Sequence, residues 1–261
     1  MGLRQASGCV SQHFSHRRLS EAERSQLLRG IVARARERTP RGPGVVVFDL
    51  DGTIMDNRPR MVAILHELGA FWGDRHPEVA TRLAKARPDG VVYGFIETLE
   101  LLGVDDPELH QEGVHFWRQR FFADPHIRHD VEVLGARDYV RACYQAGATV
   151  VYLTGRDLPN MALGSFASLR DLGFPIGVVG TELVVKPAFD MPDVEFKRMV
   201  APELARLGDV VAAFDNEAGN CNLFLEAHPA CTTIFVDTQY APDPPPLDPR
   251  AHVIHTFELE P

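Results

Sequence analysis

Residues 45–53 read Val-Val-Val-Phe-Asp-Leu-Asp-Gly-Thr, and this stretch predicts the fold. Its first four residues form an apolar, β-branched run typical of a strand buried on both faces of a parallel sheet. Side chains alternate along an extended chain, so Asp49 and Asp51 point the same way from the carboxyl end of that strand. Open α/β sheets bind ligands at this edge. Two adjacent carboxylates repel each other and need a cation or a shared proton.

The composition of the 261 residues is that of a soluble globular protein with a sizeable core, 45% hydrophobic and 24% charged. The formal net charge of −9 argues against a nucleic-acid binder, which needs basic surfaces to neutralise phosphates. None of the four cysteines forms a Cys-x-x-Cys pair, a pattern that fits a reducing cytoplasm. No run of about 18 apolar residues predicts a membrane span, and residues 1–15 lack the apolar segment of a signal peptide.

Two later strands also end in polar residues. The run Val150 to Leu153 ends in Thr154-Gly155, and the run Val210 to Phe214 ends in Asp215-Asn216. Strands that alternate with helices form a parallel sheet with their carboxyl ends at one edge, so these residues should converge on Asp49 and Asp51. Carboxylate oxygens without sulfur or imidazole suit Mg²⁺. A carboxylate nucleophile, Mg²⁺ and donors for an anion together indicate phosphoryl transfer through an aspartyl-phosphate.

The helical and strand patterns predict three units. Residues 1–42 form an N-terminal extension with one helix, which a capping box of Ser20 and Glu23 begins. Residues 43–55 and 129–261 form a doubly wound, Rossmann-like α/β core. Residues 56–128 contain only helical patterns and are too long for a simple crossover, so they predict an inserted all-α cap.

The order of these motifs resembles that of the haloacid dehalogenase (HAD) superfamily over residues ~45–240. Phe48 to Thr53 is similar to its first motif, Val150 to Arg156 to its second, and Asp215-Asn216 to its fourth. The third motif is a lysine near a helix start, for which Lys186 and Lys197 compete. Lys197 is favoured because it lies in the first turn of the helix that leads to Asp215.

The resemblance implies a role for each site residue. Asp49 would attack phosphorus, and Asp51 would protonate the leaving oxygen and then activate water. Asp49, the main-chain carbonyl of Asp51, and Asp215 would hold Mg²⁺. The groups implied to bind the phosphoryl oxygens or to assist at the site are Thr154, Gly155, Lys197 (alternatively Lys186), Asn216 and Arg156. Asn216 stands where many members have a second acid, which would weaken or redistribute metal binding.

Asp51 also discriminates among reactions of the superfamily. Dehalogenases lack this second Asp, and pump ATPases have Lys where this chain has Leu50. The resemblance therefore implies a cytoplasmic phosphatase that hydrolyses a small phosphorylated metabolite, without a nucleic-acid or membrane partner. A phosphotransferase or mutase is the alternative, and a catalytically inactive binding protein is a further one. The sequence identifies neither the substrate nor the oligomeric state. Three cap residues are candidates for recognising the substrate: His115, Arg118 and Arg120.

Overall fold

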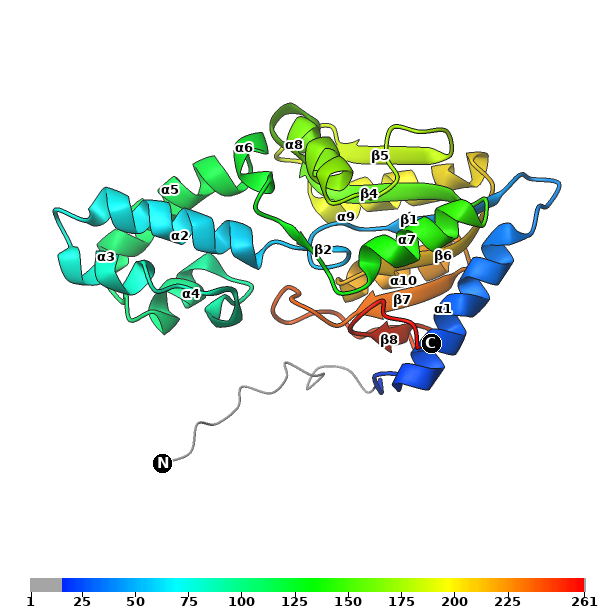
Figure 1. Cartoon of the computed structure of the whole chain (residues 1–261), viewed down its shortest axis with the longest axis horizontal. Helices are drawn as coiled ribbons and strands as arrows, with labels where there is room; N and C mark the ends of the chain where they lie inside the picture. Colours follow the sequence, from blue (N-terminus) through cyan, green and yellow to red (C-terminus); the bar gives the residue numbers. More distant parts are fainter. Residues whose placement is uncertain (1–15, 261) are drawn as a thin grey trace.

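A computed structural model of the chain describes residues 16–260, so Cys9 and the segment 1–15 lie outside the described residues. A six-stranded sheet in the order β5-β4-β1-β6-β7-β8 forms its centre (Figure 1). Every pairing in this sheet is parallel, which confirms the predicted doubly wound α/β fold. The strands are β1 (Gly44–Phe48), β4 (Thr149–Asp157), β5 (Thr181–Lys186), β6 (Asp209–Asp215), β7 (Thr232–Val236) and β8 (His252–Ile254).

Strand β1 lies in the middle of the sheet, between β4 and β6. All five of its residues are buried, as its apolar composition predicts. Val45 and Val47 pack into the core on one face of the sheet, and Val46 and Phe48 into the core on the other. The chain continues from β1 to β4 on one side and later crosses to β6 on the other. The carboxyl end of β1 is therefore the point where the strand order reverses, which is where such sheets bind ligands.

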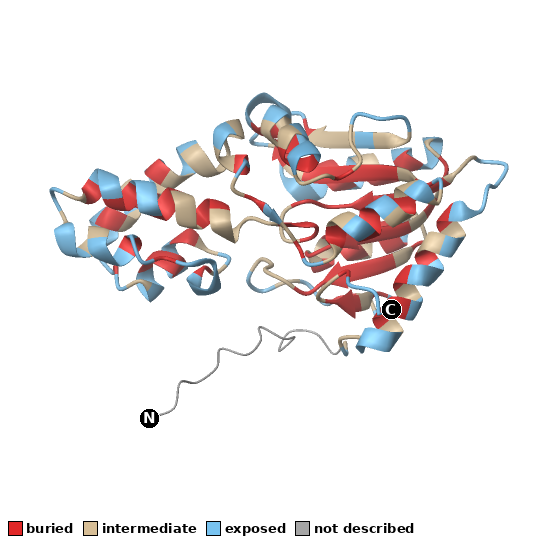
Figure 2. Cartoon of the chain, in the orientation of Figure 1, coloured by how far each residue is buried: buried red, intermediate tan, exposed pale blue. Residues whose placement is uncertain are grey.

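Helices cover both faces of the sheet. On one face lie α1 (Glu21–Arg36), α7 (Ala136–Gln145) and α8 (Leu158–Asp171), which contribute Leu28, Tyr139 and Leu169 to the core. On the other face lie α9 (Asp193–Val200), the 3₁₀ helix η2 (Ala201–Arg206) and α10 (Ala218–Ala227), with Phe196, Leu204 and Phe224. Figure 2 shows the buried strands between these two layers. No helix of residues 16–260 is both long and apolar enough to cross a membrane.

A separate helical unit follows β1. It consists of α2 (Arg58–Trp72), α3 (Pro77–Leu83), the 3₁₀ helix η1 (Pro88–Gly90), α4 (Phe95–Leu101), α5 (Pro107–Phe121) and α6 (Asp124–Ile127). These helices have their own apolar core, which contains Leu68, Trp72 and Leu99. The unit projects from the sheet on two connections (Figure 1), which pair as the antiparallel strands β2 (Met55–Asp56) and β3 (Val131–Glu132). We call this helical unit the cap. The limits 56–128 given for it from the sequence remain a prediction.

Helix α1 begins as the sequence predicts. The side chain of Ser20 accepts a hydrogen bond from Glu23 N, and the Glu23 carboxylate accepts one from Ser20 N, which completes the capping box. Leu28, Ile31 and Ala35 then pack on the sheet. The amide of Leu19 also donates to the carbonyl of Val253 in β8, so the segment before the helix joins the edge of the core.

Candidate active site

Asp49 lies immediately after β1 and is almost completely buried, with 7% of its surface exposed. One carboxylate oxygen is 2.7 Å from Lys197 Nζ, and the other accepts a hydrogen bond of 3.2 Å from Thr53 Oγ1. The chain turns at Gly52, where φ is +72°. A Cβ atom at this glycine would lie 2.3 Å from the amide nitrogen of Asn216, so only glycine lets the turn approach the end of β6.

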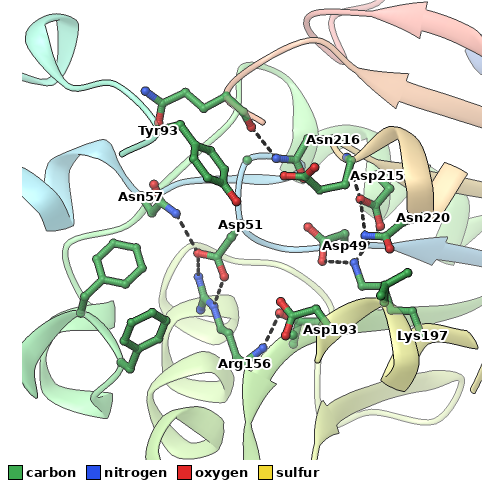
Figure 3. Close-up of a pocket in the computed structure, with 18 of the residues that line it drawn as sticks. Asp49, Asp51, Asn57, Tyr93, Arg156, Asp193, Lys197, Asp215, Asn216 and Asn220 are labelled. Atoms are coloured by element: carbon green, nitrogen blue, oxygen red, sulfur yellow. Dashed lines mark hydrogen bonds and ion pairs between the residues drawn. The ribbon is translucent and has the colours of Figure 1, made fainter. Parts of the chain in front are cut away.

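Lys197 joins the ends of two strands. Its ammonium group lies 2.7 Å from Asp49 and 2.7 Å from Asp215, which ends β6 (Figure 3). The lysine is in α9, which packs on the sheet through its neighbour Phe196. Lys186, the competing lysine, instead lies 2.7 Å from Asp193 and does not meet Asp49. The geometry therefore favours Lys197 as the lysine of the site.

The charges in this group are unbalanced. Burial raises the pKa of Asp49 to about 7, against the attraction of Lys197 and with the repulsion of Asp215. Burial alone would lower the pKa of Lys197, but Asp215 and Asp49 raise it above its ordinary value, so the lysine stays charged. Two carboxylates share one ammonium group, and a further cation would relieve the remaining repulsion.

Asp215 is held in place by groups from the segment that follows it. Its second carboxylate oxygen accepts hydrogen bonds from the amide of Glu217, at 2.9 Å, and from the side chain of Asn220, at 3.1 Å. The side-chain oxygen of Asn216 accepts a hydrogen bond of 3.1 Å from the Thr53 hydroxyl. Its side-chain nitrogen donates to the main-chain carbonyl of Gln239 at 2.5 Å. Asn216 thus links the end of β1 to the end of β6.

The second carboxylate of the first motif, Asp51, is bound by two arginines. Arg156 donates to both of its oxygens, at 2.7 and 2.9 Å, and Arg60 donates to one, at 2.7 Å. Asn57 adds a hydrogen bond of 3.1 Å. Burial alone would raise the pKa of Asp51, but Arg156 and Arg60 hold it well below its usual range. In this arrangement Asp51 is an ionised acceptor and holds no proton to donate.

The same two arginines also bind Asp130, from the segment before β3. Arg60 donates to it at 2.8 and 2.9 Å, and Arg156 at 2.6 Å. Arg60, Arg156, Asp51 and Asp130 form an electrically neutral group of four, which we call the arginine–aspartate quartet. Arg60, Arg156 and Asp130 are at most 3% exposed. Neither Arg60 nor Asp130 was predicted from the sequence. Arg60 did have a signal, because it shares a helix face with the buried Ile64 and Leu68.

Thr154 and Gly155 lie within β4, which continues to Asp157, past the end predicted at Leu153, and they line the cavity beside Asp49. Thr154 is 1% exposed, and its hydroxyl accepts a hydrogen bond of 3.2 Å from the amide of Arg156. A Cβ atom at Gly155 would lie 2.1 Å from a carboxylate oxygen of Asp193, so a side chain here would displace Asp193. These two residues of β4 therefore lie beside the end of β1.

These groups form the floor of a cavity of about 610 Å³ between the sheet and the cap. The cap supplies an apolar wall of Met61, Trp117, Phe121 and Phe122. It also supplies Tyr93, from the loop between η1 and α4, which lies over Asp51 with its hydroxyl directed toward the carboxylates (Figure 3). Tyr93 is 51% exposed and was not predicted as a site residue.

Two solved structures resemble this one with TM-scores above 0.5. A candidate phosphatase from Clostridium difficile has 15% sequence identity and a TM-score of 0.53, over 81% of this chain and 94% of that chain. Protein tyrosine kinase A from Mycobacterium tuberculosis has 17% identity and a TM-score of 0.52, over 82% of this chain and 94% of its own. A haloacid dehalogenase-like hydrolase from Streptococcus pneumoniae follows at 10% identity and 0.45, over 82% and 94%.

The chain shares the fold of the candidate phosphatase and of protein tyrosine kinase A. This parallel α/β fold is the one that the resemblance to the HAD superfamily implies. Comparisons with protein-family profiles and with curated protein sequences give no match. At these identities the structural similarity establishes the fold alone.

Within this fold, the predicted site residues fall into two sets. Asp49, Thr154, Gly155, Lys197 and Asp215 meet at one edge of the sheet, where Asp51, Arg156 and Asn216 also lie. The three cap residues proposed for substrate recognition do not line the cavity. Arg120 is bound to Glu67 at 2.9 Å, Arg118 lies over Phe189, and His115 contacts Gln119.

The oxygen atoms at the strand ends fit Mg²⁺ by type. Asp49, Asp215 and the carbonyl of Asp51 offer oxygen donors, without sulfur or imidazole. Among residues 16–260, no cluster of three or more Asp, Glu, His and Cys side chains is arranged to hold a metal. A cation here would therefore need main-chain or water oxygens besides the two carboxylates, which is how Mg²⁺ is commonly bound.

Proposed function

We propose that this protein is a Mg²⁺-dependent phosphomonoester hydrolase that acts on a small phosphorylated metabolite through an aspartyl-phosphate on Asp49. The observation that carries the proposal is the chain of contacts from Asp49 through Lys197 to Asp215 on the floor of a roofed cavity. A buried carboxylate beside one fixed cation suits attack on a phosphoryl group, whose negative oxygens need positive partners.

In the first step, an oxygen of Asp49 bonds to phosphorus and the ester P–O bond breaks. Lys197 and the Thr154 hydroxyl bind the phosphoryl oxygens. Mg²⁺ held by Asp49, Asp215 and the Asp51 carbonyl would neutralise charge on the phosphoryl group. In the second step, water attacks phosphorus and gives a proton to a base. Inorganic phosphate leaves, and the Asp49 carboxylate is regenerated.

Arg156 and Arg60 oppose both of the roles implied for Asp51. As an ionised carboxylate it has lone pairs for the proton of the attacking water, but those lone pairs are bound by the arginines. To protonate a leaving oxygen, it must first give up bonds to Arg156 and Arg60, because these bonds keep it ionised. The same bonds lower its pKa and so also make it a weak proton acceptor. We therefore propose Asp51 as the acid that protonates the leaving oxygen in the first step and as the base of the second step, in both only after it has given up bonds to Arg156 and Arg60.

The test compares the native protein with Asp49→Asn on a generic aryl phosphate, with Mg²⁺ and with EDTA. We expect Mg²⁺-dependent turnover of the native protein, and a loss of at least about a thousandfold in Asp49→Asn because the nucleophile is gone. A rapid acid quench of the native reaction should trap a phosphorylated chain that Asp49→Asn does not form. Unchanged turnover in Asp49→Asn would refute the mechanism.

The phosphotransferase alternative differs only in the acceptor. Product analysis with an added acceptor alcohol separates the two: release of inorganic phosphate alone supports the hydrolase, and transfer to the alcohol in preference to water would replace it. An absence of turnover on every phosphate ester, with binding retained, would favour a binding protein.

A further inference from the structure

The cavity of the proposed phosphatase has two different walls, and their chemistry specifies more than a phosphate group. The cap wall is aromatic. Trp117, Phe121 and Phe122 are only partly buried, and their ring centroids are 5.1 to 5.3 Å apart. Phe122 continues the cluster across to Phe189, between α9 and β5, at 5.1 Å. Rings at these distances pack edge-to-face or tilted, and a further aromatic ring can join such a cluster.

The charged lining of the cavity is mainly acidic. The basic side chains of the lining are Arg156 and Lys197. Each of them forms ion pairs with carboxylates of the protein itself. Two more carboxylates, Asp193 and Glu217, line the cavity away from Asp49. Asp193 is bound to Lys186, and Glu217 accepts a hydrogen bond from the amide of Ala241. A second anionic group on a substrate would meet these acids without a cation available to it among the lining residues.

Tyr93 stands between the two walls. Its ring is half exposed in the cavity, its hydroxyl points toward the carboxylates (Figure 3), and it interacts with Glu217. The ring offers an apolar face, and the hydroxyl offers a polar edge, to a ligand in the cavity.

We infer that the substrate of this site is a monophosphate ester whose leaving group carries an aromatic ring and no second anionic group. The inference rests on the proposed function, because the phosphate must sit on Asp49. The ring packs on Trp117, Phe121 and Phe122 with Tyr93 beside it. The lining residues offer no unpaired cation to the second anionic group of a bisphosphate or a phosphorylated carboxylic acid. The apolar wall thereby selects the leaving group, while the floor binds the phosphoryl group.

The experiment uses two pairs of matched esters with the full chain and Mg²⁺. Benzyl phosphate and cyclohexylmethyl phosphate are both esters of primary alcohols and similar in size, so they differ mainly in aromaticity. We expect kcat/KM to be roughly fivefold or more higher for the benzyl ester. The second pair is 4-carboxybenzyl phosphate and its neutral 4-carboxamide. We expect the carboxylate to be at least about tenfold poorer.

Variants of the aromatic cap wall test whether it causes the preference for the benzyl ester. In Phe122→Leu and Tyr93→Leu, the ratio of benzyl to cyclohexylmethyl turnover should fall toward one. Phe71→Leu is the matched control, since Phe71 is an exposed ring of the cap that does not line the cavity. It should keep the native ratio. Thermal unfolding of each variant confirms that it is folded.

Binding of unreactive analogues separates this inference from the proposed function. Benzylphosphonate should bind more tightly than cyclohexylmethylphosphonate in calorimetry, whether or not turnover occurs. If no ester is hydrolysed but this preference is found, the hydrolase function fails and the aromatic site stands. Equal binding or equal turnover of each matched pair overturns the inference, and so does a failure of both phosphonates to bind.

Discussion

Asp49 and Asp51 lie two residues apart and have opposite electrostatic surroundings. Asp49 faces a single ammonium group that it shares with Asp215, and burial raises its pKa to about 7. Asp51 faces two guanidinium groups, which outweigh burial and lower its pKa. Two carboxylates whose environments separate their pKa values are typical of sites that assign them different work.

The two lysines provide a test of the site at the same scale. Lys197→Met should lower kcat/KM by at least about a hundredfold, because it removes the fixed cation beside Asp49 and leaves two carboxylates unopposed. Lys186→Met is the matched control. It breaks the pair with Asp193, whose side chain is 59% exposed, and the contact of the Lys186 ammonium group with the Phe189 ring. The substitution does not touch Asp49, so we expect less than about a fivefold effect.

Steady-state kinetics with a fixed aryl phosphate measures both variants, and circular dichroism confirms that each is folded. A Lys186→Met protein impaired as strongly as Lys197→Met would contradict the assignment of Lys197.

Residues at strand ends could be predicted from the sequence, whereas their partners could not. Side-chain alternation places Asp49 and Asp51 on one side, and parallel topology brings Thr154 and Asp215 to the same edge. The bonds of Arg156 to Asp51 and Asp130 depend on how the cap connections pass the sheet, which no local pattern encodes. The orientation of α5 could not be predicted either. The face of α5 toward the cavity presents aromatic rings, whereas His115, Arg118 and Arg120 lie away from the cavity lining.

At the scale of elements, the arginine–aspartate quartet joins the core to both connections of the cap. Arg156 comes from β4, Arg60 from the first turn of α2, and Asp130 from the segment before β3. The ion pairs are buried, so each partner depends on the others to offset the cost of leaving water. The quartet therefore fixes the base of the cap.

Removing one member should be costly. We expect Asp130→Asn to lower the free energy of unfolding by about 3 kcal/mol, because it leaves buried guanidinium charge uncompensated. Urea denaturation measures the change. Asp171→Asn is the control, since the Arg170–Asp171 pair is exposed on α8 and should contribute little to stability. Equal effects in the two variants would argue against a stabilising quartet.

A second contact between cap and core depends on a glycine. The amide of Gly164 in α8 donates to the Asp124 side chain of α6 at 2.6 Å, and a Cβ atom at Gly164 would lie 2.6 Å from the Asp124 carbonyl oxygen. Gly164→Ala should push α6 from α8 and destabilise the protein by about 1 to 3 kcal/mol.

Gly30→Ala in α1 is the control for this substitution. Nothing lies within 4 Å of its Cβ position, so alanine should be neutral or stabilise the helix by up to about 1 kcal/mol. Thermal unfolding compares the stability of the two variants. If Gly164→Ala is as stable as Gly30→Ala, α6 moves away from α8 without loss of stability, which would contradict the prediction.

The whole molecule should lose stability in mild acid partly through β8. Burial lowers the pKa of His252 from its ordinary value of 6.5. His252 therefore binds a proton more readily in the unfolded chain than in the folded one. Neutral His252 favours the folded state, and this contribution to stability is lost as the pH falls through 6.5 toward the pKa of the folded state. His252→Gln should flatten the dependence of unfolding free energy on pH between about 7 and 5.5. Denaturation at a series of pH values tests this, and an unchanged slope would contradict it.

The architecture as a whole was accessible from the sequence because each strand of the core is marked by its own composition. The buried runs of β1, β4 and β6 and the helical stretch before β3 predict a parallel sheet with an inserted helical unit. The pairing of β2 with β3 was not predicted. A two-residue strand buries too little apolar surface to leave a sequence pattern, and forms because both connections leave the core at one point.

Helix α1 and the segment after β8 have a consequence for synthesis on the ribosome. Arg24 Nε donates to the Glu258 carbonyl at 3.0 Å, and the Glu260 amide donates to Ser25 Oγ at 2.8 Å, across 234 and 235 residues. The ribosome adds about 5 to 20 residues per second, so these partners are made roughly 12 to 47 seconds after the helix. A nascent chain therefore carries α1 incompletely covered until residues 258–260 emerge, and a chain released before then would expose that helix to chaperones and proteases.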